Sequence, residues 1–165
     1  MATYEPIATT TLGSAASTIT FSSIPATYTD LKIVWVYKDA GTSNETAWLR
    51  FNSDTGSNYS RTTLRGDGSA ASSTRNTNST AIFVTAGNSD STIDQMLTVD
   101  VFNYAGSTYK TALIDSVQDE NGSGWVSRIV GLWRNTSAIT TIDLFLNGTN
   151  MAAGTTATLY GILKA

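Results

Sequence analysis

The sequence predicts an all-β protein, a two-sheet antiparallel sandwich with a jelly-roll-like arrangement. Apolar and polar residues alternate over short runs, and no stretch keeps the i, i+3, i+4, i+7 spacing of an amphipathic helix. Clusters of Gly, Asn and Asp separate the runs, and these residues tolerate the positive φ angles of hairpin turns. About nine strands in one open sheet would expose a long apolar face, which two packed sheets bury.

The strand pattern recurs nine times along the chain. Leu97, Val99 and Val101, for example, alternate with Thr98 and Asp100, so that one face packs and the other meets water. In chain order the nine runs are residues 17–21, 30–38, 47–52, 80–85, 95–104, 109–117, 125–134, 139–146 and 155–163.

Two of the runs, residues 31–37 and 129–133, are apolar on both faces. Such strands are covered on both sides, so we expect central strands or strands whose outer face another subunit covers. Residues 66–80 contain no apolar side chain larger than alanine and are predicted to form a long surface loop. Apolar runs lie on both sides of this stretch, so residues 1–165 are predicted to be a single domain.

Residues 1–12 are predicted to be extended, with two open alternatives. Pro6 has no backbone N–H and cannot occupy a central strand, so the segment is either an edge strand or an N-terminal arm. An arm would pair with a neighbouring subunit and cover an exposed sheet edge. It would place Tyr4, Pro6 and Ile7 at an interface with another subunit or with a capsid.

The composition argues against an enzyme. The chain has no histidine and no cysteine, which excludes Ser-His-Asp and Cys-His catalytic arrangements. Its thirteen acidic residues leave a polysaccharide-cleaving enzyme as a remote alternative. Most of them lie in turns, where an Asp side chain bonds local backbone amides. No catalytic residue and no cofactor is predicted.

The partners that charge and hydropathy allow are also few. A net charge of −3 provides no positive field for nucleic acid, and no apolar run is long enough to span a membrane. Residues 52–58 resemble part of a calcium loop but lack its distal Glu, and a tight turn explains the same residues, so no metal site is predicted. The first residues lack the regions of a secretory signal, and we expect synthesis in a bacterial host cytoplasm.

Trp48 is the aromatic residue whose position best fits a contact surface. It shares a strand face with Arg50, opposite Leu49 and Phe51, and Tyr59 is expected on the adjoining loop. Trp and Arg are enriched at interfaces of many kinds. Trp48, Arg50 and Tyr59 are therefore a candidate contact for a protein or a glycan, with a core position as the alternative for Trp48.

Five segments carry a family resemblance, and together they extend over nearly the whole chain. As a set they resemble small structural proteins in the virions of tailed bacteriophages. The matching residues lie at strand ends and turns and carry no chemistry. The segments are Tyr4-Glu5-Pro6-Ile7-Ala8-Thr9, residues 21–31, residues 50–60, Gly131-Leu132-Trp133-Arg134 and residues 154–162.

The resemblance implies a component of the virion surface. Together with the strands that are apolar on both faces, it predicts a capsid decoration (cement) protein that binds the major capsid protein and stabilises the assembled shell. We expect such a protein to be a homo-oligomer, most simply a trimer. The alternative is a tail- or fibre-associated adhesion module that binds a host surface glycan through Trp48, Arg50 and Tyr59.

Overall fold

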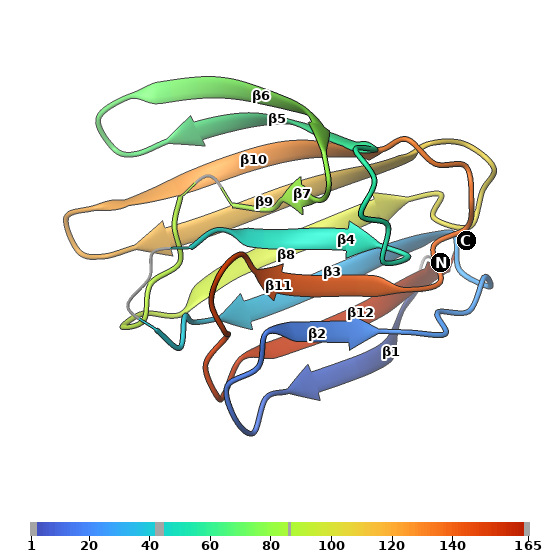
Figure 1. The fold of residues 1–165 in the computed structure, drawn as a ribbon, viewed down its shortest axis with the longest axis horizontal. Helices are drawn as coiled ribbons and strands as arrows, with labels where there is room; N and C mark the ends of the chain where they lie inside the picture. The colour runs from blue at the N-terminus through green and yellow to red at the C-terminus, as the bar shows by residue number, and fades with distance from the viewer. Residues whose placement is uncertain (1–2, 42–44, 86, 164–165) are drawn as a thin grey trace.

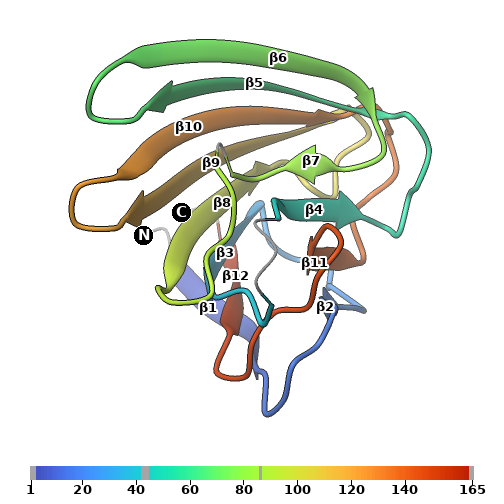
Figure 2. The same cartoon turned by 60° about the vertical axis from the view of Figure 1, so that its left-hand side comes forward.

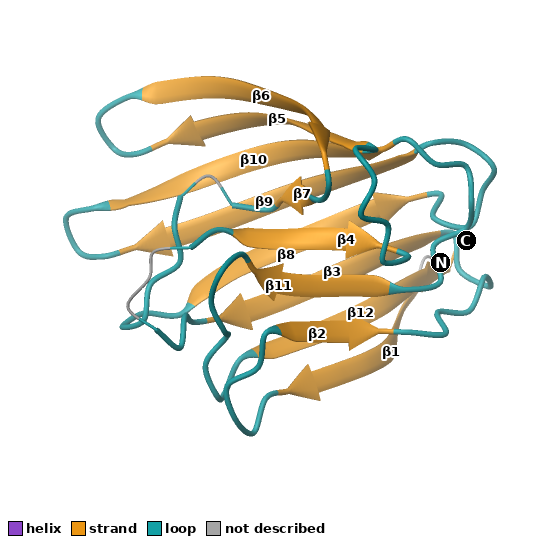
Figure 3. Ribbon diagram, in the orientation of Figure 1, coloured by secondary structure: helices purple, strands orange, loops and turns teal. Residues whose placement is uncertain are grey.

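The computed structural model describes residues 3–41, 45–85 and 87–163. These residues form twelve β-strands and no helix, and the strands lie in two antiparallel sheets (Figure 3). The predicted all-β sandwich is therefore confirmed. The strands are β1 (Thr3–Thr11), β2 (Thr18–Phe21), β3 (Asp30–Tyr37), β4 (Ala47–Phe51), β5 (Tyr59–Gly66), β6 (Ala71–Ser79), β7 (Ile82–Phe83), β8 (Gln95–Phe102), β9 (Lys110–Asp119), β10 (Gly124–Trp133), β11 (Ile142–Leu146) and β12 (Thr156–Leu163).

Eight of the strands have the connectivity of a jelly roll (Figure 1). One group of four has the spatial order β1-β12-β3-β8, and the facing group has the order β2-β11-β4-β7. The chain crosses between the groups at β1 to β2, β2 to β3 and β3 to β4, and again at β7 to β8, β8 to β11 and β11 to β12. This is the doubled Greek key that closes a sandwich without a long exposed apolar face.

Two hairpins are inserted into this jelly roll. One is β5–β6, between β4 and β7, and the other is β9–β10, between β8 and β11. Both join the same sheet, whose order becomes β1-β12-β3-β8-β9-β10-β5-β6, while the facing sheet keeps four strands. Figures 1 and 2 show that β5 and β6 project past β7, at the top of both views. The narrower sheet therefore covers only part of the wider one.

The core lies where the two sheets overlap. In β3, Leu31, Ile33, Trp35 and Tyr37 are buried, and the residues between them are half-buried. This period of two is expected for a strand that turns one face toward the facing sheet. Strand β3 is central, between β12 and β8, as its apolar composition predicts. Other members of the core are Ile19, Phe21, Leu49, Phe51, Val99, Val101, Ile114, Ile129, Ile142, Leu144 and Leu159.

Arg61 ties the inserted β5 to the narrower sheet. Its Nη1 donates to the carbonyl oxygens of Phe83 and Thr85, at 3.2 and 2.8 Å, and its guanidinium lies 4.4 Å from the centre of the Phe83 ring. Burial lowers the pKa of this guanidinium. Beside it, a Cβ on Gly131 would stand 2.8 Å from Ile82, so glycine permits the close approach of β10 and β7.

The prediction of a surface loop over residues 66–80 is wrong. Residues 71–79 form β6, which pairs with β5 through a turn at Asp67 and Gly68. Nearly every residue of β6 is exposed because neither of its faces meets the second sheet. The strand is held by main-chain pairing, so its sequence shows no alternation of apolar and polar residues.

The N-terminal segment is an edge strand of its own fold. Strand β1 pairs antiparallel with β12, and the register shifts between Pro6 and Ala8, which leaves Ile7 in a bulge. Residues 1–12 were predicted to be either an edge strand or an N-terminal arm, and residues 3–11 form the edge strand. Residues 1 and 2 lie outside the described residues. Pro6 occupies the outermost strand of the sheet, where its missing N–H costs no ladder bond.

Candidate functional site

The outer face of the eight-stranded sheet carries apolar side chains that nothing else in the described part of the chain covers. Met96 is 47% exposed, Val117 38% and Val126 60%. Leu64 and Val130 on the same face are also exposed. Exposed apolar residues are common singly, but a continuous group on a regular sheet marks an interaction surface.

The strand register brings Met96, Val117 and Val126 into one line with the half-buried Val36. Val36 pairs with Met96, Met96 with Val117, and Val117 with Val126, across β3, β8, β9 and β10. We call Val36, Met96, Val117 and Val126 the apolar row. Because directly opposed side chains lie about 5 Å apart, the row is a continuous strip across the middle of the sheet.

The charged residues beside the apolar row are paired with each other. Lys32 contacts Asp100 at 2.8 Å across β3 and β8, and Arg128 lies 3.6 Å from Asp115 across β10 and β9. These pairs leave no excess of one charge on their side of the apolar row. On the other side, toward the tip of the β9–β10 hairpin, Asp94 and Asp119 form no ion pair among the described residues and leave an excess of negative charge. A partner therefore needs an apolar surface here, bordered by neutral or basic groups.

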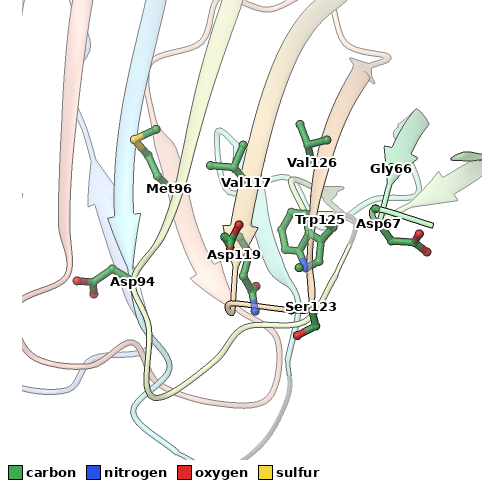
Figure 4. Close-up of a pocket in the computed structure, with 13 residues that line it drawn as sticks. Gly66, Asp67, Asp94, Met96, Val117, Asp119, Ser123, Trp125 and Val126 are labelled. Carbon is green, nitrogen blue, oxygen red and sulfur yellow. The ribbon is translucent and has the colours of Figure 1, made fainter. Parts of the chain in front are cut away.

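The apolar row ends in a shallow hollow of about 680 Å³. Met96, Val117 and Val126 stand side by side on its apolar wall, and Asp119 and Ser123 lie toward the tip of the β9–β10 hairpin (Figure 4). The hollow gives an otherwise flat sheet a recess for a protruding side chain of a partner. Its other lining residues are Gly66, Asp67, Gly68, Asp94, Gln118, Gly122, Gly124 and Trp125.

Trp48 and Arg50 lie on the other side of the molecule, on the outer face of the four-stranded sheet. The Trp48 ring packs 3.9 Å from the Phe83 ring and 6.1 Å from the Phe145 ring, centre to centre. The Arg50 guanidinium lies 4.7 Å from the centre of the Phe145 ring. All four side chains are half-buried, so this aromatic cluster remains accessible in part.

Tyr59 does not belong to that surface. It begins β5 rather than lying on a loop, and its side chain is fully buried and stacked on Trp133. Its hydroxyl accepts a bond from the Phe51 N–H and donates to the Phe51 carbonyl, both at 3.1 Å. The structure therefore keeps Trp48 and Arg50 together and removes Tyr59 from the predicted contact.

The predicted interface residues of the N-terminal segment also differ in exposure. Tyr4 and Pro6 are exposed on β1, whereas Ile7 packs against the core. At the free edge of β1, Tyr4 and Pro6 are therefore accessible to a neighbouring molecule, whereas most of Ile7 is not.

The loop with some likeness to a calcium site is built as a turn. Asp54 accepts bonds from the Gly56 N–H, the Asn58 amide and the Trp133 indole N–H, at 2.8, 2.9 and 2.7 Å. Burial works against ionisation of Asp54, but these bonds outweigh it and lower the pKa of the carboxyl. Within residues 3–41, 45–85 and 87–163, no three acidic side chains converge on a position for a metal ion.

The apolar row was not among the predicted contact residues, although part of its signal was present. The outer-face residues of 129–133 gave strand β10 apolar character on both faces, and Val130 is one of the exposed side chains. Met96, Val117 and Val126 fall on one line only through the strand register, which no local pattern encodes.

Comparisons of the chain with protein-family models, curated proteins and solved structures find no match in any of the three. Among the described residues there is also no helix with the length and apolar character needed to cross a membrane.

Proposed function

We propose that this chain is a capsid decoration (cement) protein of a tailed bacteriophage and binds the assembled shell through the outer face of its eight-stranded sheet. The observation that carries the proposal is the apolar row, in which Met96, Val117 and Val126 are exposed and Val36 is half-buried, with paired charges along one side. The resemblance of the sequence to small virion proteins supports the same function.

The geometry of the face suits a contact with a large, regular partner. Its side chains stand on hydrogen-bonded strands rather than on loops, so binding orders little of the backbone. The hollow beside Val126 would receive one protruding residue of the major capsid protein. A protein that binds the assembled lattice and not the free subunits stabilises the shell by mass action.

The free edge of β1 supports association between copies of the chain. Tyr4 is 56% exposed there, next to Pro6, which has no N–H to offer an added strand. Contact at this edge would therefore rely on side chains more than on an extended ladder. We propose a trimer, and sedimentation velocity of the purified chain tests it. A monomer at every concentration would contradict the trimer without affecting the capsid contact.

Co-sedimentation with capsid shells tests the main proposal. The wild-type chain is expected to pellet with assembled shells and to remain soluble alone, and cryo-electron microscopy should place it on the head. Val126→Lys puts a charge in the apolar row and should abolish pelleting, whereas Thr18→Lys on the opposite face of the molecule should not. Equal pelleting of both variants would exclude this face as the contact.

A second candidate function is adhesion to a host surface glycan at Trp48 and Arg50. The half-buried cluster of Trp48, Phe83, Phe145 and Arg50 favours it, since exposed aromatic rings bind sugar faces. Trp48→Ala should reduce cell binding by tenfold or more, on the order of the loss for a central interface Trp. Unchanged cell binding by that variant would remove this surface from consideration.

A further inference from the structure

The inner face of the eight-stranded sheet changes character toward the tips of the inserted hairpins. Under the four-stranded sheet this face is apolar, with Ile114 and Ile129 paired across β9 and β10. Two residues further along the strands the pair is Ser116 and Ser127, and Ser127 in turn pairs with Arg65 of β5. We call this polar part of the inner face the polar floor. Buried polar side chains weaken a core unless they are hydrogen-bonded within the chain or to a bound molecule.

Several polar groups of this floor have no partner within the chain. Arg65 Nε, Gln118 Oε1 and Ser127 Oγ are buried without a hydrogen bond among the described residues. Gln118 is only 7% exposed, and its amide nitrogen donates to Glu120. Because a carboxylate only accepts, the amide NH₂ faces Glu120 and leaves the amide oxygen free to accept another bond.

Two grooves meet at these residues. One, of about 360 Å³, runs between the sheet and the segment 87–90, and the other, of about 620 Å³, runs between the tips of the β5–β6 and β9–β10 hairpins. Arg65, Glu120 and Trp125 line both grooves. Volumes of this size fall in the range of small-molecule sites, roughly 300–1,000 Å³.

We propose that these joined grooves bind a neutral saccharide. Hydroxyl groups both donate and accept, and the site offers an unpartnered acceptor on Gln118 and an unpartnered donor on Arg65. Trp125 also supplies an aromatic wall.

The charges around the grooves select against the other ligand classes. Asp67, Asp90 and Glu120 line the grooves and repel an anionic sugar or a phosphate. Among the described residues, Arg65 is the one cationic side chain that lines the grooves, and it disfavours a cation at its own position. A ligand without net charge meets neither penalty. This inference does not rest on capsid binding and uses none of the residues of the apolar row, although Asp67, Gln118 and Trp125 line both the grooves and the hollow beside that row.

A glycan array probed with the full-length chain tests the proposal. The array carries neutral oligosaccharides of glucose, galactose, mannose and N-acetylglucosamine beside sialylated and sulfated ones, and calorimetry then measures the Kd of the neutral compound that binds best. Arg65→Met and Gln118→Leu should each weaken that binding about tenfold or more. Arg75→Met, the same charge change on the neighbouring strand β6 and outside the grooves, should leave it unchanged.

Each remaining outcome overturns the proposal. Absence of binding to every neutral saccharide would show that only water fills the grooves, and stronger binding of anionic compounds would refute the ligand class. Binding that Trp48→Ala abolishes and both groove variants retain would place the glycan at the aromatic cluster instead. Arg65→Met replaces an unpartnered buried Nε with an apolar chain of similar length, so its melting temperature should match that of the wild type. Gln118→Leu also removes the bond to Glu120, so its melting temperature, measured in parallel, separates a loss of folding from a loss of binding.

Discussion

At the scale of single residues, the Tyr59 hydroxyl takes the place of a strand neighbour. Strand β7 pairs with Trp48 and Leu49 of β4 and extends no further along it. At Phe51 the free N–H and carbonyl of β4 bond the Tyr59 hydroxyl instead. One phenol therefore bonds two main-chain groups: the Phe51 N–H, which would be costly to leave unpaired, and the Phe51 carbonyl, which also accepts from the Asp54 N–H at 3.0 Å.

Tyr59→Phe should destabilise the fold by about 1–3 kcal/mol, because it leaves the buried Phe51 N–H without a partner and the Phe51 carbonyl with only the bond from the Asp54 N–H. Chemical denaturation followed by tryptophan fluorescence measures the change in the free energy of unfolding. Tyr4→Phe is the control, since the exposed Tyr4 should tolerate the change within about 0.5 kcal/mol. Equal stability of the two variants would mean that the Phe51 groups find other partners.

Some residue roles could not be predicted from sequence, and Lys110 shows why. A lysine at the start of a strand indicates a solvent-exposed position. Lys110 is instead fully buried and donates to the carbonyl oxygens of Gly106, Thr108 and Thr136, at 2.7, 2.5 and 3.3 Å. Its partners come from two loops that only the folded chain brings together, and the same holds for Tyr59 and Phe51.

At the scale of elements, the β5–β6 hairpin depends on its turn because the second sheet does not cover it. Asp67 Oδ1 accepts bonds from the Ala70 N–H and from the Ser69 N–H and hydroxyl, at 2.9, 3.0 and 2.8 Å. These bonds, that of Ala70 first, lower the pKa of Asp67 to about 2. The carboxylate is therefore favoured in the folded hairpin over the free chain.

The hairpin should open as pH falls. A carboxyl whose folded pKa lies below its ordinary value of 3.8 stabilises the fold above that pH, and the contribution is lost as pH drops from 3.8 toward 2. Amide exchange of residues 71–79, measured by NMR across this range, should show lost protection in the wild type. Asp67→Asn keeps an acceptor but does not titrate, so its protection should vary less with pH. Identical pH profiles would contradict this role for Asp67.

Arg61 links the inserted strand β5 to the narrower sheet of the jelly roll. Arg61→Met should lower the free energy of unfolding by about 1–3 kcal/mol, because it removes two bonds to main-chain carbonyls and the contact with the Phe83 ring. Denaturant unfolding measures the loss. Arg75→Met, on the exposed β6, should change stability by less than about 0.5 kcal/mol, and a similar loss in both variants would rule out a special role for Arg61.

Whether an element could be predicted from the sequence depends on the interactions that stabilise it. All nine predicted runs contain a strand, because burial on one face imposes a period of two that can be read locally. Strand β6 was missed because its pairing with β5 involves main-chain groups, which every sequence has. Strand β5 was missed because only Tyr59 and Thr63 in it are well buried.

At the scale of the whole molecule, the fold presents two unlike outer surfaces. The wide sheet shows the apolar row, and the narrow sheet shows the aromatic cluster around Trp48. The fold class was predictable, since it depends on alternation and turns. The position of the apolar row was not, since it depends on the register between strands far apart in sequence.

Bound chain should raise the temperature at which capsid shells release their DNA. At a free concentration about 100 times its Kd, a protein that binds only the assembled state adds about 2.7 kcal/mol per site. Dye fluorescence during heating detects the release. The shift should grow with wild-type concentration and be absent with Val126→Lys, and it should persist in high salt, because the contact is apolar. A release temperature independent of added chain would contradict a cementing role.

The insertions have a consequence for how such a molecule can diversify. Each hairpin leaves the jelly roll and returns to it without changing the order of the eight scaffold strands. The parts of the hairpins beyond the four-stranded sheet can therefore vary in length and surface, whereas Tyr59, Ile114 and Ile129 belong to the core and must be kept. Homologous chains in which the β5–β6 segment is shortened or exchanged would keep the same eight-stranded framework and bind different partners.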